Sequence, residues 1–306
     1  MRHCIVITGP TATGKTALAV RLAKRLNTEV ISADSMQVYS GMDIGTAKPT
    51  LAERAGVVHH LLDVCAPDEP FSAARYVDLA TPIVERLLAE GKTPVIVGGT
   101  GQYIDALLKG EDFSPFSGAR RSELQAQLET GGIEPLLAQL QRIDPARAAI
   151  LAPNDHKRIL RALEVFYETG ETITGHDARS KMRPPRFSAH TFVLQYAERA
   201  ALYERINRRV DEMMAAGLVA EIKRLLAQGI APTATAMQAI GYKELIPPML
   251  AGEGLDEAVA LLKQRSRNYA KRQLTWHRRN AAAISIVWNQ VPDLDWALEK
   301  ICEVNQ

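Results

Sequence analysis

The chain has 306 residues, of which 46% are hydrophobic and 24% are charged, with a formal net charge of +2 at pH 7. This balance excludes a disordered or fibrous chain and is typical of one large or two modest globular domains. No apolar stretch approaches the roughly 20 residues that cross a membrane, so we expect no membrane partner.

The cysteines and the start of the sequence bear on the cellular compartment. Cys4, Cys65 and Cys302 are odd in number and have no metal-ligand spacing, which favours reduced core residues. The first apolar run begins almost at Met1, so we expect no signal peptide. Both observations predict a cytoplasmic protein.

The first predicted element is a short apolar strand that ends at Thr8 and leads into a glycine-rich loop and a helical pattern. The loop reads Gly9-Pro10-Thr11-Ala12-Thr13-Gly14-Lys15-Thr16, the spacing of a phosphate-binding loop between strand and helix. Its glycines let backbone N–H groups point inward, Lys15 adds a positive charge, and Thr16 offers a hydroxyl to Mg²⁺. The pattern predicts a diphosphate or triphosphate site on a P-loop NTPase-like α/β fold, a parallel sheet flanked by helices. It does not distinguish transfer of the phosphate from its departure.

The second predicted strand, residues 29–33, ends in a polar segment that begins with Asp34. Ligands of doubly wound sheets lie at the carboxyl ends of the strands, so Asp34 is a candidate acid, base or metal-organising group. Ser35, Gln37 and Tyr39 add hydrogen-bonding groups at the same edge. The alternative is that Asp34 only caps a turn.

A loop over residues 41–49 precedes a short predicted strand over residues 57–64, which contains His59 and His60. Adjacent residues of a strand face opposite ways, and no third metal ligand is near in the sequence. We therefore interpret the histidine pair as structural.

A helix is predicted from a Ser72 cap to about Glu90, with apolar positions at Tyr76, Leu79, Ile83, Leu87 and Leu88. The next strand, residues 94–97, closes in a second glycine-rich segment that carries Thr100 and Gln102. Many phosphate-loop ATPases have an acidic residue at such a strand end to organise Mg²⁺ and water, whereas this one has a hydroxyl and an amide. The alternative for Thr100 is a purely structural role in the turn.

No strand is predicted in residues 113–187, which follow a linker-like segment around Pro115. We expect a helical insertion domain there, between two parts of a catalytic core formed by residues 1–112 and 188–306. Its helices are predicted over residues 120–129, 133–141, 145–151 and 155–168.

The end of this insertion is basic. Arg158 and Arg161 share a face of its last predicted helix, which indicates either a ligand surface or a solvated face. Residues 179–186 are basic and contain two prolines, and we interpret them as a lid or a return linker.

The remaining chain alternates strand and helix patterns again. The predicted elements are a strand over 190–195, helices over 198–216, 218–228 and from 238, a long helix over 255–279, a strand over 284–288 and a helix over 294–303. Between Lys263 and Arg279 the long helix has seven lysines or arginines and no acidic residue, with Tyr269, Trp276 and His277 interleaved. Basic and aromatic side chains together suit RNA, because phosphates need charge and splayed bases need stacking faces. The alternative is a solvated helix whose tryptophan packs in the core.

Several stretches together, in this order, resemble the bacterial tRNA dimethylallyltransferases, also called tRNA isopentenyltransferases. They extend along nearly the whole chain and show no departure at the positions expected to be functional. The stretches cover residues 9–16, 31–39, 43–49, 59–61, 98–103, 158–164 and 269–276.

The resemblance implies transfer of a dimethylallyl group from dimethylallyl diphosphate to N6 of adenosine 37 in the tRNA anticodon stem-loop, with Mg²⁺. The phosphate loop, from Gly9 to Thr16, would hold the diphosphate that leaves, with Thr16 at the metal. By the same resemblance Thr100 and Arg209 are catalytic on the diphosphate side, with Arg208 as the alternative to Arg209. Asp34 would accept the N6 proton. We expect a monomer.

The resemblance also implies a set of tRNA contacts. These are Asp34, Ser35, Met36, Gln37, Thr100, Gln102, Arg158, Ile159, Leu160, Arg161, Ala162, Gln238, Gly241, Tyr242, Lys243, Lys271 and Arg272.

Three rival functions share parts of this pattern. A phosphate-loop kinase for a nucleoside or small metabolite would use the same loop but would consume ATP. A non-catalytic RNA-binding protein would use the basic helix but would leave Asp34 and Thr100 without a role. An isopentenyltransferase for free AMP would not need the long basic C-terminal region.

Overall fold

A computed structural model describes residues 3–110, 119–182 and 184–305. The chain divides into two compact units, Met1–Gly110 with Arg186–Gln306, and Glu111–Pro185. The expected boundary at residue 113 and the linker around Pro115 lie outside the described residues.

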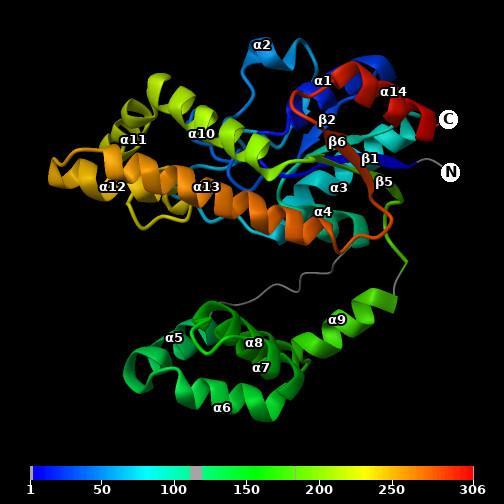
Figure 1. The fold of residues 1–306 in the computed structure, drawn as a ribbon. Helices are drawn as coiled ribbons and strands as arrows, with labels where there is room; N and C mark the ends of the chain where they lie inside the picture. Colours follow the sequence, from blue (N-terminus) through cyan, green and yellow to red (C-terminus); the bar gives the residue numbers. More distant parts are fainter. Residues whose placement is uncertain (1–2, 111–118, 183, 306) are drawn as a thin grey trace. The chain divides into compact units, whose positions relative to one another are not determined.

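The first unit is built on a six-stranded sheet with the strand order β3-β2-β4-β1-β5-β6, and the predicted parallel sheet is confirmed. Figure 1 shows this sheet among the helices of the unit. The strands are β1 (Cys4–Thr8), β2 (Val30–Ser32), β3 (His59–His60), β4 (Val95–Gly98), β5 (Ala189–Tyr196) and β6 (Ile284–Trp288). In the register, Thr8 lies opposite Gly98, and Ser32 lies opposite Val97. The segments that follow β1, β2 and β4 therefore begin at the same edge of the sheet, where ligands of such sheets bind.

The strand expected over residues 57–64 is wrong in length, because β3 has only two residues. Leu61 and Asp63 have φ angles of 63° and 58°, in the left-handed region. Such backbone cannot continue a strand, so the chain turns directly after His60. His60 itself contacts Glu29 with Nε2 at 2.6 Å from the carboxylate, as a structural partner.

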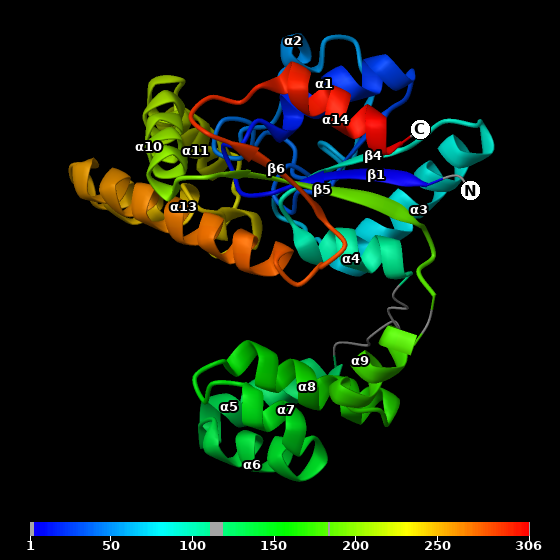
Figure 2. The same ribbon diagram turned by 45° about the vertical axis from the view of Figure 1, so that its right-hand side comes forward.

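Helices cover both faces of the sheet, and Figure 2 shows α1 (Lys15–Leu26) and α14 (Leu294–Val304) on one face. On the other face lie α3 (Ala73–Ala89) and α4 (Gly101–Lys109). The Ser72 cap of α3 is confirmed, since its hydroxyl accepts the N–H of Arg75 at 3.2 Å. The predicted apolar face of α3 is partly wrong, because Leu79 is 37% exposed; the buried side chains are Tyr76, Val77, Ala80, Val84 and Leu87.

The remaining helices of this unit gather beyond the carboxyl edge of the sheet (Figures 1 and 2). They are α10 (Arg199–Ala215), α11 (Leu218–Ala227), the short 3-10 helix η1 (Ala236–Gln238), α12 (Tyr242–Ala251) and α13 (Asp256–His277). They form a second apolar cluster around Tyr39, Met42 and Tyr242, separate from the cluster under the sheet. A one-turn helix, α2 (Leu51–Arg54), was not predicted and begins at a capping box between Thr50 and Glu53.

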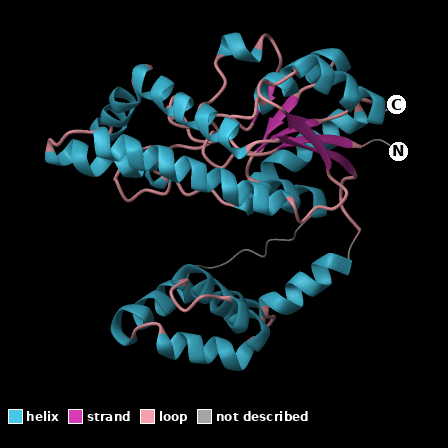
Figure 3. Cartoon of the chain, viewed as in Figure 1, coloured by secondary structure: helices cyan, strands magenta, loops and turns pink. Residues whose placement is uncertain are grey.

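The second unit contains helices only, within the residues that the structure describes (Figure 3). The four predicted helices are confirmed, and a fifth, α9, was missed; the helices are α5 (Ala119–Gly131), α6 (Glu134–Ile143), α7 (Pro145–Ile150), α8 (His156–Thr169) and α9 (Ile173–Met182). The interpretation of residues 179–186 as a lid or linker is thus wrong up to Met182, where the chain is helical and Arg179 pairs with Glu171. This segment lacks apolar residues at helical spacing, so its pattern carried no helix signal.

Candidate active site

The phosphate loop is curled by three residues with positive φ, namely Gly9 at 138°, Ala12 at 65° and Gly14 at 85°. A Cβ on Gly9 would lie 2.3 Å from the carbonyl oxygen of Leu194 in β5, so glycine is required there by space as well as by conformation. The loop is also braced internally, because the Thr13 hydroxyl donates to the carbonyl of Pro10 at 2.8 Å. The loop is therefore curled and internally bonded, as its glycines predict.

Lys15 begins α1 and turns back over the loop, where its ammonium donates to the Pro10 carbonyl at 2.7 Å. Burial and the positive charge of Arg209 lower the pKa of Lys15 to about 7, against the opposing effect of Asp34. A cation that is held partly desolvated in this way gains strongly from an arriving anion. The site is therefore prepared for a negatively charged group.

Two residues for which the sequence predicted no role, one on α13 and one on α10, bond to the phosphate loop. Gln273 of α13 accepts the Thr11 N–H at 3.0 Å and donates its amide to the Gly99 carbonyl at 3.0 Å. Arg205 of α10 donates to the Ala12 carbonyl at 3.1 Å. The available sequence signals are the four-residue spacing of Arg205 from Arg209 and the uncharged Gln273 within a basic helix.

The same face of α13 places His277 against the end of β1, with Nε2 3.2 Å from the Thr8 hydroxyl. Burial and the charge of Lys15 lower the pKa of His277 to about 4, so the ring is neutral near pH 7. The expectation that His277 belongs to an RNA-stacking face is wrong, because the ring is buried. Trp276 is half-buried and packs so closely that a Cβ on Gly101 would lie 2.2 Å from its ring.

Asp34 follows β2. Its carboxylate caps a turn and lies near the positive charges of Lys15 and Arg209. Its Oδ1 accepts the N–H of Met36 at 2.9 Å and of Gln37 at 3.4 Å. Within the described chain no hydrogen bond reaches its Oδ2. The Asp34 charge acts on both Lys15 and Arg209, raising the pKa of each against burial. The turn-capping alternative therefore accounts for one oxygen and leaves the second for a ligand.

Thr100 follows β4 and joins this strand end to the Asp34 segment. Its hydroxyl accepts the Ser35 N–H at 3.0 Å, and its own N–H donates to the Ala33 carbonyl at 3.1 Å. The approach is close enough that a Cβ on Gly98 would lie 2.1 Å from the Ala33 oxygen. Tyr269 of α13 lies near Asp34 and Thr100, and burial raises the pKa of its phenol to about 12, so the basic helix also reaches this point.

The two adjacent arginines on α10, Arg208 and Arg209, point in different directions. Arg209 is half-buried, and its pKa is lowered by burial against the opposing charge of Asp34. Arg208 has a side chain that is 59% exposed and lies 3.8 Å from Glu212 on the same helix. Successive helical residues point about 100° apart, so only Arg209 faces Lys15 and Asp34.

The side chains predicted to contact tRNA are exposed, half-buried or buried. Exposed side chains are those of Gln102, Arg158, Gln238, Lys243, Lys271 and Arg272, and half-buried ones are those of Ser35, Met36 and Arg161. The side chains of Ile159, Leu160, Ala162 and Tyr242 are buried in apolar clusters, so any RNA contact at these positions falls to the backbone. Gln37 is half-buried, with its amide bonded within the protein.

The described residues offer a small oxygen donor set for a magnesium ion. Thr16 is half-buried in the first turn of α1, and Asp34 lies within electrostatic reach of Lys15 in the same loop. The described residues contain no group of three or more His, Cys, Asp or Glu side chains that could hold a metal. Magnesium is commonly held by few protein oxygens together with phosphate and water, so this donor set fits an ion that comes with a diphosphate.

Comparison with known proteins identifies the family. The model of the IPP transferase family matches residues 37–280 of this chain. The chain belongs to this family. A curated relative from Pelobacter propionicus, named tRNA dimethylallyltransferase 1, is 44% identical over 290 residues, which cover 94% of this chain and 93% of the relative. A relative from Halalkalibacterium halodurans, named tRNA dimethylallyltransferase, is 44% identical over 303 residues, covering 98% and 95%.

Solved structures agree with this assignment. The full-length tRNA isopentenylpyrophosphate transferase from Bacillus halodurans is 41% identical with a TM-score of 0.74, covering 100% of this chain and 96% of that chain. A eukaryotic dimethylallyltransferase that acts on tRNA is 28% identical with a TM-score of 0.84, covering 99% and 78%. The fold of this chain is thus that of the tRNA isopentenyltransferases. No described helix is long and apolar enough to span a membrane.

Proposed function

We propose that this chain transfers a dimethylallyl group from dimethylallyl diphosphate to N6 of adenosine 37 in tRNA and releases diphosphate. Membership of the IPP transferase family supports prenyl transfer to tRNA. The observation that carries the chemistry is the convergence of Lys15, Arg209 and Asp34 at one sheet edge. Two cations beside one carboxylate suit a leaving anion next to a group that must lose a proton.

The phosphate loop stabilises the leaving group. As the C–O bond of the donor breaks, negative charge accumulates on the diphosphate, and this charge faces Lys15, Arg209 and backbone N–H groups of the phosphate loop. These groups are fixed before the reaction, so they stabilise the transition state more than the ground state. Thr16 would hold a magnesium ion together with the diphosphate, and the ion would add to the neutralisation of that charge.

Asp34 acts on the acceptor. The N6 amine is a weak nucleophile because its lone pair is delocalised into the adenine ring. The Oδ2 of Asp34 accepts a hydrogen bond from N6 and then its proton as the new C–N bond forms. Thr100 bonds the Ser35 backbone and so holds the segment that carries Asp34. The base must leave the stack of the RNA loop to reach this carboxylate.

The tRNA binds along α13 and in the groove between α13 and α10. Arg199, Tyr203, Lys271, Thr275 and Arg278 line this groove, and no acidic residue joins them among the described lining residues. The Lys271 ammonium lies 5.8 Å from the centre of the Tyr203 ring. Cations and an aromatic ring together suit phosphates and bases of the anticodon stem-loop. We propose that the enzyme works as a monomer in the cytoplasm.

A direct assay tests the function. The protein is incubated with unmodified tRNA, dimethylallyl diphosphate and Mg²⁺, and the oligonucleotide fragments from a nuclease digest of the tRNA are analysed by mass spectrometry. We expect the mass of one dimethylallyl group on adenosine 37 and stoichiometric release of diphosphate. Steady ADP formation from ATP with a small acceptor, and an unmodified tRNA, would support the kinase alternative instead.

A further inference from the structure

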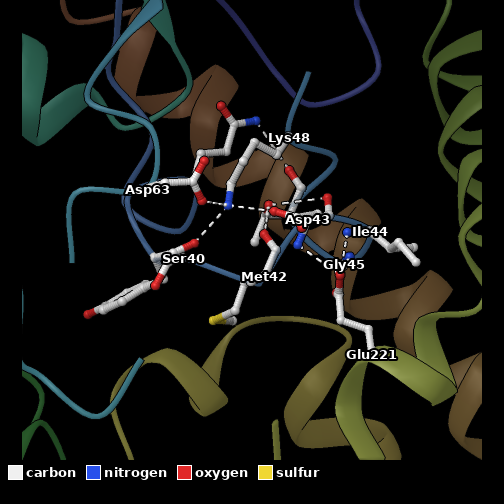
Figure 4. A network of polar contacts seen from close by, with 12 residues as sticks. Ser40, Met42, Asp43, Ile44, Gly45, Lys48, Asp63 and Glu221 are labelled. Carbon is white, nitrogen blue, oxygen red and sulfur yellow. Dashed lines mark hydrogen bonds and ion pairs between the residues drawn. The ribbon is translucent and has the colours of Figure 1, made fainter. Parts of the chain in front are cut away.

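Glu221 of α11 holds a loop that lies next to the site, defined here as the 43–48 loop (Figure 4). Glu221 is buried, with 5% of its surface exposed. One oxygen accepts the N–H groups of Asp43 and Ile44, each at 2.8 Å, and the other accepts the N–H of Gly45 at 3.0 Å. Three consecutive backbone donors therefore converge on one buried carboxylate, which fixes the path of the loop.

Tyr242 completes this anchor. Its hydroxyl donates to Glu221 at 2.6 Å, and a Cβ on Gly45 would lie 2.4 Å from the Tyr242 ring. Burial and the neighbouring Glu221 charge raise the pKa of Tyr242, so the phenol remains a donor. The loop backbone thus lies directly on the ring and on the carboxylate, without room for a shift.

Lys48 fixes the other end of the loop. Its ammonium is buried and donates to the Tyr39 carbonyl at 2.8 Å, to Asp43 at 2.7 Å and to Asp63 at 2.5 Å. All three of its donors are therefore satisfied. Figure 4 shows the Lys48 and Glu221 contacts on the same short segment.

Gln37 connects this loop to the Asp34 carboxylate. Its amide nitrogen donates to the carbonyls of Thr46 and Ala47 at 3.3 and 3.2 Å, and its amide oxygen accepts the Ser32 hydroxyl at 3.3 Å. Its backbone N–H donates to Asp34 Oδ1 at 3.4 Å. A continuous series of hydrogen bonds thus runs from α11 to the carboxylate that faces the acceptor.

We propose that Glu221 is a positioning residue for prenyl transfer, which acts on Asp34 through the 43–48 loop and Gln37. The inference rests on the proposed role of Asp34 as the base. Proton acceptance from N6 needs the free oxygen of Asp34 at a defined place, and a displacement of about 1 Å can slow a reaction by about 10²-fold. Glu221 does not touch the substrates, so its removal changes the rate and leaves binding of the donor unchanged.

The test uses single turnovers of the full chain with saturating tRNA and donor. Glu221→Gln keeps the side-chain size but exchanges an acceptor for a donor, so at least one loop N–H loses its partner. We expect the chemical step to slow by about 10-fold and donor affinity to stay within about two-fold. A normal chemical step in a folded Glu221→Gln protein would overturn the proposal.

Double-mutant cycles separate positioning from a general loss of structure. In the Gln37→Met and Asp34→Asn backgrounds, Glu221→Gln should slow the chemical step by less than about three-fold, because the pathway is already broken. An undiminished loss in both backgrounds would overturn the proposal. If instead the wild-type protein prenylates no tRNA, the proposed function fails before any variant is compared.

A milder variant and a matched control distinguish a positioning effect from misfolding. Tyr242→Phe removes one of the four donors to Glu221 and should slow the chemical step by about two- to five-fold with the fold intact. Asp144→Asn is the matched control, because this buried carboxylate also accepts backbone N–H groups, those of Arg147 and Thr174, but lies in the other unit. It should lower thermal stability without changing the chemical step, and an equal slowing in this control would count against the proposal.

Discussion

At the scale of single residues, Asp34 uses one oxygen to cap a turn, and no hydrogen bond within the described chain reaches the other. If Oδ2 accepts the N6 proton, Asp34→Asn keeps the shape and both substrates, and the chemical step slows by about 10²–10⁴-fold. Single-turnover measurements at saturating donor and tRNA separate this effect from binding. Asp295→Asn, an exposed carboxylate on α14 that pairs with Arg21, is the control and should react normally. A large loss of donor affinity in Asp34→Asn would place this carboxylate on Mg²⁺ instead.

Lys15 gives a pH prediction at the same scale. Its pKa of about 7, below the ordinary 10.5, must rise when a diphosphate binds, so the protein takes up protons on binding above pH 7. At pH 8 we expect about 0.9 proton more for the wild type than for Lys15→Met, measured calorimetrically in buffers of different ionisation enthalpy. Diphosphate protonation is common to both proteins and cancels in this difference. Equal proton uptake by the wild type and by Lys15→Met would mean that Lys15 is already charged in the free protein.

The low pKa of Lys15 also makes the free energy of unfolding depend on pH. Between about pH 7 and 10.5 the unfolded chain holds a proton on Lys15 that the folded chain lacks. The contribution of Lys15 to the free energy of unfolding therefore rises with pH in this window and reaches its lowest value below pH 7. His277 has the same effect at lower pH. Because burial lowers its pKa from the ordinary 6.5 to about 4, its contribution to the free energy of unfolding rises with pH between about pH 4 and 6.5.

At the scale of the element, α13 has two faces with different tasks. Gln273 and His277 lie one turn apart and contact the phosphate loop and β1. Lys271 and Arg272 are exposed on the rest of its surface. One helix thus supports the phosphate loop with its buried face and presents positive charge with its exposed face, so RNA bound to that face would lie close to a donor in the loop.

This division predicts a salt effect. Neutralising Lys271 and Arg272 to glutamine should weaken tRNA binding and lower the slope of log K against log salt concentration by about 0.7–0.9 for each phosphate that the protein no longer neutralises. Donor affinity should not change. Binding titrations at several salt concentrations measure the slope, with Lys24→Gln and Arg25→Gln on α1 as the control of equal charge. An unchanged slope would exclude this face from RNA binding.

At the scale of the whole molecule, the two units have separate apolar clusters. Leu136, Leu140, Ile159 and Leu163 form the centre of the second unit, and none of them belongs to the clusters of the first unit. The phosphate loop lies in the first unit alone. A ligand that binds only a folded site stabilises the unit that contains the site.

We therefore expect two transitions in scanning calorimetry. Diphosphate at about 100 times its Kd should stabilise one transition by about 2.7 kcal/mol and leave the other in place. In Lys15→Met neither transition should move as far at the same ligand concentration. One common transition that shifts as a whole would show that the units unfold together.

The phosphate loop, the parallel sheet and the insertion of helices could be predicted from the sequence, because they depend on short-range spacing. Residues 9–16 are contiguous, and their glycines and lysine carry the cradle locally. The strand ends at Asp34 and Thr100 followed from the rule that parallel strands meet their ligands at one edge.

The tertiary structure alone decided which distant side chains complete the site. Arg205 lies 193 residues from Ala12, and Gln273 lies 262 residues from Thr11. Glu221 lies 178 residues from Asp43, whose N–H it accepts. No local pattern encodes such contacts, because they depend on the docking and the rotation of α10, α11 and α13 about their axes. That rotation is also what turns Arg209 inward and Arg208 to solvent, a difference that composition and periodicity could not resolve.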